Sequence, residues 1–396
     1  MNILLGVTGG IAAYKMLSLA SSLVKNGHNV EVCMTPKARE FVTTTSFEAI
    51  IHKEVVLSDD QFLHGAKNQH IRLAKFADIM VIAPASANTV AKLVMGMGDN
   101  IVTLTALAST CKKLVFPAMN INMYLNEITQ SNINKLDQYD NYEVIQASSG
   151  YLACGDTGIG RLAEPSEIYD IIMNRAYPNK DMIGKKVLVN AGPTMESIDP
   201  VRFITNHSSG KMGLEIARAF SYRGADVTLI SGKSGLKAPF GVKIIEAVSA
   251  NDMYNAINEN IKGKDIVVLS AAVADYTPIE YSESKIKKKD GNLVIELKRT
   301  KDILKALGEK KEFVLVGFAM ETESLIENAK AKLISKNADM IVANSINKEG
   351  AGFGYDTNVA SLITRNGCTN LDKLSKYDLA HKIIDKIGEE FYARLR

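Results

Sequence analysis

The 396-residue chain has no tryptophan, only four cysteines and no excess of one charge. Its 47 basic and 44 acidic residues give a net charge of +3, too balanced for the basic surface of a nucleic-acid-binding protein. Cys33, Cys111, Cys154 and Cys368 form no C-x-x-C pair, which argues against a disulfide framework or a structural zinc site. No apolar run reaches the ~18 residues that cross a bilayer, and the first residues do not resemble a signal peptide. We therefore expect a cytoplasmic protein with small-molecule partners, no nucleic acid and no membrane.

Two stretches share one layout, an apolar strand followed by a glycine-containing turn and a helix. They read NILLGVTGGIAAYK at the N-terminus and KVLVNAGPTMESIDPVRFITNHSSGKMG over residues 186–213. Backbone donors at a helix start make a favourable phosphate site. Because 396 residues suffice for about two domains, the pattern predicts an α/β protein with two tandem doubly wound domains. Near Asp181 proline, glycine and charge replace apolar periodicity, so we place the domains at residues 1–180 and 181–396.

In the first half, apolar runs predict buried strands at residues 3–7, 30–34, 79–83 and 114–117. Ligands of doubly wound sheets bind outside the carboxyl ends of the strands, and short polar side chains follow two of these runs. Thr35 suits a phosphate or ring contact or a helix cap equally, whereas PASANTVAK taken alone favours a cap. The first strand is not followed by G-x-G-x-x-G, which favours a mononucleotide such as FMN over a dinucleotide. The candidate FMN-binding residues are Gly9, Gly10, Ile11, Thr35, Ser86, Asn88 and Thr89.

Three further side chains in this half are candidates for chemistry. His70 precedes the third strand, and a lone histidine is most often a surface or hydrogen-bonded residue. Asn120 follows the fourth strand, where it could bind a substrate carboxylate or shape a turn. Residues 146–162, QASSGYLACGDTGIGRL, form a long glycine-dense stretch that we interpret as a functional lid carrying Cys154. Cys33 and Cys111 lie in or beside strand-like runs and are expected to be inert core thiols.

The motifs TGGIAAYK, PASANTVAK, PAMNINMY and ACGDTGIGR, in this order, resemble the FMN-dependent phosphopantothenoylcysteine decarboxylases of the homo-oligomeric flavin-containing cysteine decarboxylase family. The resemblance implies a flavodoxin-like FMN-binding domain in which His70 is the active-site histidine and Asn120 binds substrate. It implies that flavin oxidises the thiol carbon so that CO2 can leave, and that Cys154, on a mobile clamp, supplies a proton to the aminothiol product. Tyr124 stands where the family motif has tryptophan, which keeps an aromatic wall.

The second half shows apolar strand-like runs at residues 226–230, 266–270, 313–318 and 339–343. Lys332 and Lys336 are one helical turn apart and could reach one triphosphate, although basic helices are common on surfaces. On periodicity alone, the lysine cluster beginning at Lys285 is an exposed face. Residues 361–368 predict a hairpin with a type I′ turn, and Ser375 with Asp378 predicts the start of the last helix.

The second half resembles the CTP-dependent phosphopantothenate-cysteine ligases through GPT, DPVRFITNHSSGKMG, AVADY, KIKK, VGFAMET and KNADMIVAN. The resemblance implies a Rossmann-like ligase domain in which Asn206 holds an acyl-cytidylate intermediate and Lys285 stabilises the transferring phosphate. KDIL at residues 301–304 departs from a more usual PDIV at Lys301. The implied CTP-binding residues are Ser270, Ala271, Asp275, Lys285, Lys301, Asp302, Ile303, Leu304, Phe318, Lys332 and Lys336.

Together the two resemblances imply two consecutive steps of coenzyme A synthesis. Phosphopantothenate attacks the α-phosphate of CTP, cysteine displaces CMP, and the first half decarboxylates the product to phosphopantetheine. We expect Mg²⁺ to be held mainly by CTP phosphates and water, because the sequence contains no obvious carboxylate cage. The resemblance further implies trimeric decarboxylase and dimeric ligase contacts. The alternatives are a decarboxylase of peptide C-terminal cysteines and a regulatory flavoprotein without activity.

Overall fold

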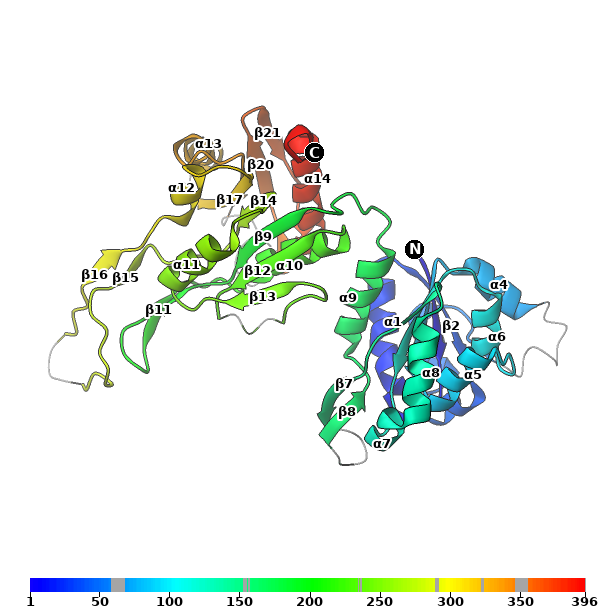
Figure 1. The fold of residues 1–396 in the computed structure, drawn as a ribbon. Helices are drawn as coiled ribbons and strands as arrows, with labels where there is room; N and C mark the ends of the chain where they lie inside the picture. The colour runs from blue at the N-terminus through cyan, green and yellow to red at the C-terminus, as the bar shows by residue number, and fades with distance from the viewer. Residues whose placement is uncertain are drawn as a thin grey trace. The chain divides into compact units, whose positions relative to one another are not determined.

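The computed structural model describes residues 1–57, 68–151, 155, 157–233, 235, 237–288, 292–321, 324–345 and 355–395. These residues divide into two compact units, Met1–Ala176 and Tyr177–Arg396, each of which is described by itself (Figure 1). Each unit is built on a largely parallel sheet flanked by helices. The predicted α/β fold with two tandem doubly wound domains is confirmed.

The first unit contains a six-stranded sheet in the order β3-β2-β1-β4-β5-β6, and all its described pairings are parallel. Apart from the two-residue edge strand β3, this is the flavodoxin-like order. The four strands predicted from apolar runs are present, with ends shifted by at most two residues. The strands are β1 (Asn2–Val7), β2 (Asn29–Met34), β3 (Val56–Leu57), β4 (Ile79–Ala85), β5 (Lys112–Pro117) and β6 (Tyr142–Val144).

Helices cover both faces of this sheet, which explains why its strands are apolar without alternation. On one face Leu4, Met80, Ile82 and Val115 are fully buried against α4, α5, α6 and α8. Helix α1 packs against α2 and α9. The helices are η1 (Ile11–Tyr14), α1 (Lys15–Lys25), η2 (Pro36–Glu40), α2 (Thr44–Ile51), α4 (Gln69–Phe76), α5 (Ala87–Met95), α6 (Ile101–Ala108), α7 (Ile121–Leu125), α8 (Glu127–Asp137) and α9 (Pro165–Ala176).

The glycine-dense stretch at residues 146–162 contains two strands, β7 (Ser148–Tyr151) and β8 (Thr157–Arg161), which pair antiparallel. The stretch that we interpret as a lid therefore contains regular paired strands, which the sequence did not predict. Glycine has low strand propensity, which hid the pairing in the sequence. Cys154 lies outside the described residues.

The second unit contains an eight-stranded sheet in the order β13-β12-β9-β14-β17-β18-β20-β21. The first six are parallel, and β20 and β21 form an antiparallel edge. The strands are β9 (Lys186–Ala191), β12 (Asp226–Ser231), β13 (Lys243–Glu246), β14 (Ile266–Leu269), β17 (Val314–Glu321), β18 (Met340–Ser345), β20 (Ala360–Thr364) and β21 (Gly367–Asn370). Three short pairs accompany them: β10 (Met195–Ser197) with β11 (Phe203–Thr205), β15 (Tyr276–Pro278) with β16 (Leu297–Arg299), and β19 (Thr357–Asn358) with β22 (Leu374–Ser375).

Successive residues of β9 enter different cores of this unit. Val187 and Val189 join a cluster with α10 and α14, whereas Leu188 joins a cluster with α11, α12 and α13. The sheet therefore has a helix layer on each face. The helices are α10 (Lys211–Tyr222), α11 (Ala250–Asn260), α12 (Ile303–Gly308), α13 (Leu325–Ser335) and α14 (Lys376–Leu395).

Two local predictions for this unit had different outcomes. The Ser375 cap is confirmed, because the Asp378 backbone N–H donates to the Ser375 hydroxyl at 3.0 Å. The type I′ turn is wrong: Thr364 pairs with Gly367, so Arg365 and Asn366 form the turn, and neither has the positive φ that a type I′ turn requires.

The chain that follows α9 is fixed to the second unit at its first residue. The Tyr177 hydroxyl lies 3.0 Å from His381 Nδ1, and the two rings stack at 4.9 Å. The Arg223 guanidinium, 3% exposed, donates to Asp181 and to Asp385 at 2.7 Å each. Residues near the predicted boundary thus contribute to the second unit's own packing.

Candidate functional sites

The first unit contains a cavity of about 470 Å³ at the carboxyl ends of β1, β4 and β5. Among the predicted site residues, Gly10, Ile11 and Asn120 line it. This position is where doubly wound sheets bind their ligands. The full lining is Gly10, Ile11, Ala12, Tyr14, Lys15, Pro84, Ala118, Met119, Asn120, Tyr151, Gly160, Arg161 and Leu162.

The Gly9-Gly10 turn presents backbone to this cavity. A Cβ at Gly9 would lie 2.7 Å from Lys37 Cγ, so the close approach of η2 requires glycine there. Gly10 precedes η1 and has no side chain with which to cap it. The first N–H groups of a helix have no intrahelical acceptor, so those of Ile11 and Ala12 suit an anionic ligand.

Thr35 follows β2 and carries a buried hydroxyl. The residue is 8% exposed, and its Oγ has no hydrogen-bond partner in the described part of the chain. Thr35 is the N-cap residue of η2, as the alternative interpretation predicted, but its side chain makes no capping hydrogen bond. An unpaired buried hydroxyl is costly, and a ligand acceptor or donor at this strand end would remove that cost.

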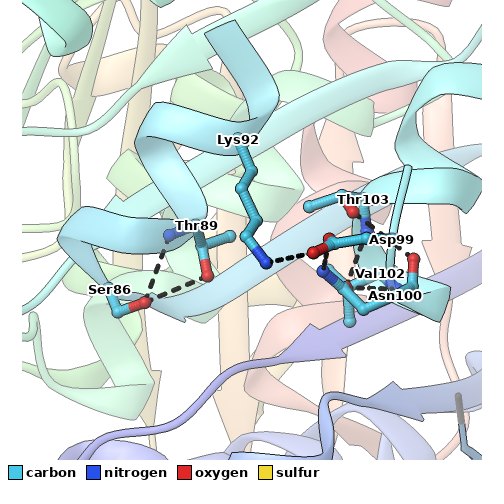
Figure 2. Close-up of polar contacts among 7 residues, drawn as sticks. All are labelled: Ser86, Thr89, Lys92, Asp99, Asn100, Val102 and Thr103. Carbon is cyan, nitrogen blue, oxygen red and sulfur yellow. Dashed lines mark hydrogen bonds and ion pairs between the residues drawn. The ribbon is translucent and has the colours of Figure 1, made fainter. Parts of the chain in front are cut away.

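Ser86 begins α5 and forms the predicted cap: its Oγ accepts from the Thr89 N–H at 3.3 Å and lies 3.0 Å from the Thr89 hydroxyl (Figure 2). The Thr8 hydroxyl donates to the Pro84 carbonyl at 2.7 Å and accepts from the Ser86 N–H at 3.2 Å. Asn88 is exposed. The cap and the Thr8 bridge fix the end of β4 relative to β1.

The far end of α5 is held by a second set of polar contacts, also drawn in Figure 2. Lys92 Nζ donates to Asp99 at 2.5 Å, and this bond holds the pKa of the Asp99 carboxyl below its ordinary value. The Asn100 side chain accepts from the N–H groups of Val102 and Thr103 at 3.1 Å each and so caps α6. The α5–α6 connection is therefore ordered from both sides.

Asn120 follows β5, and its carboxamide oxygen accepts from the Asn122 N–H at 2.8 Å. Strand β8 packs directly on this segment. A Cβ at Gly158 would lie 2.3 Å from Ile121 Cδ1, and one at Gly160, where φ is +129°, would lie 2.3 Å from the Met119 carbonyl. The glycines of the ACGDTGIGR motif thus permit the β7–β8 hairpin to approach Asn120.

Lys15 is the buried cation of this site, 9% exposed, and pairs with Glu164 at 3.0 Å. Glu164 also pairs with Arg161 at the end of β8. The pair links the helix that follows the glycine turn to the base of the hairpin. Because Glu164 pairs with both Lys15 and Arg161, which line the cavity, one carboxylate serves two cations and the lining keeps a positive charge.

His70 lies in α4, is half-buried and does not line the cavity. Its helix is held by Arg72, which pairs with Glu31 of β2 at 2.7 Å. The first unit therefore brings Asn120, but not His70, to the cavity. Cys33 is fully buried, and burial raises the pKa of its thiol to about 12, which confirms an inert core thiol.

The second unit contains a cleft of about 750 Å³ lined by five separate segments, at the ends of β9 and β14, at residues 299–305, on β17 and on α13. We refer to it as the nucleotide cleft. Nine of the eleven predicted nucleotide-binding residues line it: Ala271, Asp275, Lys301, Asp302, Ile303, Leu304, Phe318, Lys332 and Lys336.

The cations of the nucleotide cleft have internal partners. Lys336 Nζ lies 2.5 Å from Asp302, and Lys332 Nζ donates to the Phe318 carbonyl at 2.9 Å. Burial acts to raise the pKa of Asp302, but the hydrogen bond from Lys336 and that from the Lys305 N–H lower it overall. Lys301, the departure from the family pattern, lies 4.4 Å from the centre of the Tyr254 ring. Lys332 and Lys336 do lie together, as their helical spacing predicted.

Ser270 and Lys285 do not line the nucleotide cleft. The Ser270 hydroxyl donates to the Asn190 carbonyl at 2.6 Å, and Lys285 is exposed on the segment that joins β15 and β16. Asn206 donates to the Ala272 carbonyl at 3.0 Å. The sequence reasoning missed Asn190, which is 1% exposed and lines the cleft; an asparagine at the end of an apolar strand was the available signal.

A smaller cavity of about 150 Å³ shares Ala271 and Phe318 with the nucleotide cleft and opens at the start of α10. Lys376, 7% exposed, lines it, and burial lowers the pKa of its amine. The Asn344 carboxamide oxygen also lines it and has no partner among the described residues. The buried lysine suits an anionic group of a ligand, and the unpaired Asn344 oxygen suits a hydrogen-bond donor.

Within the described residues, no three His, Cys, Asp or Glu side chains come close enough to hold a metal ion. Nor does any described helix have both the length and the apolar composition that a bilayer crossing requires.

Two families of known proteins match the chain, one for each half. Residues 1–177 match the Flavoprotein family, and residues 182–391 match the family described as DNA/pantothenate metabolism flavoprotein C-terminal domain. The coenzyme A biosynthesis bifunctional protein CoaBC of Bacillus subtilis (strain 168) is 44% identical over 98% of this chain and 96% of its own length.

A cysteine/cysteine sulfinic acid decarboxylase from an unknown prokaryotic organism is 42% identical over 82% of this chain and 92% of its own length. A crystal structure of the C-terminal domain of a coenzyme A biosynthesis bifunctional protein CoaBC is 41% identical. It covers 52% of this chain and 96% of its own, with a TM-score of 0.46.

Proposed function

The chain belongs to the family of bifunctional coenzyme A biosynthesis proteins, and on that premise we propose how its residues carry out the two reactions. It is a bifunctional enzyme: the flavoprotein half is a phosphopantothenoylcysteine decarboxylase and the second half a phosphopantothenate-cysteine ligase. The proposal concerns the nucleotide, the metal, the assembly and the residues that act.

In the decarboxylase, the N–H groups after Gly10 would hold the FMN phosphate, and Thr35, Ser86, Asn88 and Thr89 would contact the cofactor from neighbouring strand ends. The unpaired Thr35 hydroxyl and the uncapped η1 fit such a group. Bound FMN supplies a reversible electron acceptor for the substrate's thiol carbon. Asn120 orients the substrate carboxylate and Cys154 returns a proton to the product.

In the ligase, Lys332 and Lys336 bind the triphosphate of CTP, and Asp302 gives up Lys336 when the nucleotide arrives. Phosphopantothenate attacks the α-phosphate, forming an acyl-cytidylate and releasing pyrophosphate, and the cysteine amine then displaces CMP. Charge that develops on the phosphate is stabilised by Lys285 and by Mg²⁺ held between phosphates and water. Asn206 holds the acyl-cytidylate, and the small cavity at α10 accepts an anionic group of a substrate.

One observation carries the nucleotide assignment: nine implied contacts, spread from residue 271 to residue 336, line one cleft whose lining includes four lysines and one arginine. The experiment supplies phosphopantothenate, cysteine and Mg²⁺ with CTP or ATP and follows pyrophosphate and CO2. We expect both products in the reaction with CTP. Pyrophosphate release with ATP but not with CTP would contradict the choice of nucleotide.

Two lysines of one helix give a matched pair of variants. Lys336→Met should raise the KM for CTP about tenfold, because one charge-assisted contact is worth about 1.5–3 kcal/mol. Lys330→Met removes an exposed lysine of α13 outside the cleft and should leave KM unchanged. Lys285→Ala should abolish pyrophosphate release, and an unchanged rate would exclude its role.

For the decarboxylase, Cys154→Ser should still bind FMN and release CO2 but accumulate an oxidised ene-thiol. A normal aminothiol yield from this variant would remove the role of Cys154. Free cysteine, offered in place of phosphopantothenoylcysteine, tests the alternative suggested by the cysteine/cysteine sulfinic acid decarboxylase relative. We expect little turnover of free cysteine, because the ligase half supplies the longer substrate.

We further propose a cytoplasmic homo-oligomer in which the decarboxylase forms trimers and the ligase forms dimers. The absence of His70 from the lining of the Asn120 cavity supports completion of the site by a second copy. Ile11 and Tyr14, at the cavity, are each 57% exposed, which suits contact with another chain. Light scattering that gives a monomeric mass with full activity would contradict this assembly.

A further inference from the structure

Asn190 occupies the point where the ligase sheet reverses its strand order. It is the penultimate residue of β9, which lies between β12 and β14, and it pairs in register with Ile230 on one side and Leu269 on the other. Its side chain is almost completely buried, yet the residue lines the nucleotide cleft. Ligand sites of doubly wound sheets form at such switch points.

The Asn190 carboxamide continues the hydrogen bonding of β14 beyond the end of that strand. Strand β14 ends at Leu269, and the Asn190 Oδ1 accepts from the next two N–H groups, those of Ser270 at 2.8 Å and Ala271 at 3.0 Å. The Asn190 carbonyl accepts from the Ser270 hydroxyl at 2.6 Å. One residue therefore makes three bonds to the first two residues of the segment 270–275.

The same segment is hydrogen-bonded near its far end and is contacted by helix α10. The Ala274 N–H donates to the buried Thr194 hydroxyl at 2.9 Å, and the Ala274 carbonyl accepts from the Thr300 hydroxyl at 2.7 Å. A Cβ at Gly213 of α10 would lie 2.4 Å from Ser270 Oγ and 2.8 Å from the Asn190 carbonyl oxygen. Because α10 packs so closely, the segment has one position while the Asn190 bonds are intact.

We infer that Asn190 is a positioning residue of the ligase, whose carboxamide fixes segment 270–275 and thereby places Ala271 and Asp275 in the wall of the nucleotide cleft. The inference rests on the proposed nucleotide function of that cleft. An apolar side chain of similar size leaves two half-buried N–H groups without their acceptor, which is costly. The segment then moves to find other partners, and the cleft wall moves with it.

The test compares Asn190→Leu, which has no acceptor, with Asn190→Asp, which keeps the oxygen that both N–H groups use. Asn190→Leu should raise the KM for CTP about tenfold, the effect of losing one to two kcal/mol of buried hydrogen bonding, with a smaller change in kcat and no change in the KM for cysteine. Asn190→Asp should stay within about threefold of the wild type, because backbone donors stabilise a carboxylate. Calorimetry with CTP gives the dissociation constant independently of turnover.

Thr228→Val is the matched control. Thr228 is 5% exposed on the adjacent strand β12, its hydroxyl accepts from Lys264 at 2.8 Å, and it does not line the cleft. This variant should lose stability without a change in KM for CTP. Decarboxylation of supplied phosphopantothenoylcysteine should be equal in all variants.

The outcomes separate the inference from the function on which it rests. If the wild type does not bind CTP, the nucleotide assignment is wrong whatever Asn190 does. If the wild type binds CTP and Asn190→Leu binds it equally well, or if Asn190→Asp is as impaired as Asn190→Leu, the positioning role is wrong. If the ligase half of Asn190→Leu does not fold, Asn190→Ala replaces it, and its KM for CTP relative to that of the wild type gives the same test.

Discussion

Replacing Thr35 by valine changes one hydroxyl in the flavin site and makes opposite predictions for the apo and holo forms. The Thr35 hydroxyl is buried and has no partner among the described residues, so valine, which has the same shape, removes an unpaired polar group. We expect apo stability to stay unchanged or rise by up to about 1 kcal/mol. The FMN complex loses one hydrogen bond of about 1 kcal/mol, so FMN should bind about fivefold more weakly.

The measurement uses protein freed of flavin, whose unfolding is followed before FMN is titrated by the quenching of its fluorescence. Thr105→Val is the matched control. The Thr105 hydroxyl is also buried and unpaired among the described residues but lies within α6, whereas Thr35 follows β2 and its N–H bonds the Val7 carbonyl at the end of β1. It should stabilise the apo protein equally and leave FMN affinity unchanged. Wild-type FMN affinity in Thr35→Val would show that Thr35 does not contact the flavin.

Three further predictions concern the hairpin, the cleft and the C-terminal helix. Gly160→Ala should reduce decarboxylase activity at least tenfold with normal ligase activity, because alanine at φ +129° meets the Met119 carbonyl; equal activity would contradict the packing. Lys301→Pro should change the KM for CTP by less than about threefold, since the Lys301 amine is directed to the Tyr254 ring. Burial lowers the pKa of His381 to about 4, so the free energy of unfolding of the second unit should fall by about 2 kcal/mol between pH 6.5 and pH 4 as the unfolded state takes up a proton. Denaturant titrations of the wild type and of His381→Gln test this. An equal dependence of the unfolding free energy on pH in the two proteins would refute it.

The central parallel strands could be predicted because each is buried on both faces and therefore reads as an unbroken apolar run, whereas the edge strands β6 and β13, which are half-buried or exposed, were missed. Burial on both faces holds for β1, β4 and β9, whose interiors are fully buried. Strands β7 and β8 could not be predicted, because their stability comes from packing of glycine backbone onto residues 119–121, and glycine alone carries no strand signal. Turn type failed at Arg365-Asn366 because strand register, set by the cross-strand pairing, decides which residues occupy the turn.

The nucleotide cleft shows a different limit. Helical spacing was enough to place Lys332 beside Lys336, but the approach of residues 299–305 to α13 depends on the order of β14, β17 and β18 in the sheet. Sequence motifs identified the cleft's members only through their family resemblance. Asn190 escaped this reasoning because its contacts are to backbone N–H groups 80 residues away, which no local pattern encodes.

Each site lies at the carboxyl ends of the strands of its own sheet, but the two sites differ in how their charged groups are paired. In the flavin cavity Lys15 and Arg161 share one carboxylate, that of Glu164, so a cofactor would be held by the remaining positive charge together with backbone donors and hydroxyls that need not move between turnovers. In the nucleotide cleft Lys336 is paired with Asp302, whose depressed pKa keeps it ionised. A ligand must then outcompete an internal carboxylate, which a triphosphate can do and a monophosphate product does less well. The Lys336–Asp302 pair would therefore favour entry of CTP and departure of CMP. A substrate that is consumed in each cycle must enter and leave in this way, whereas a resident cofactor stays bound.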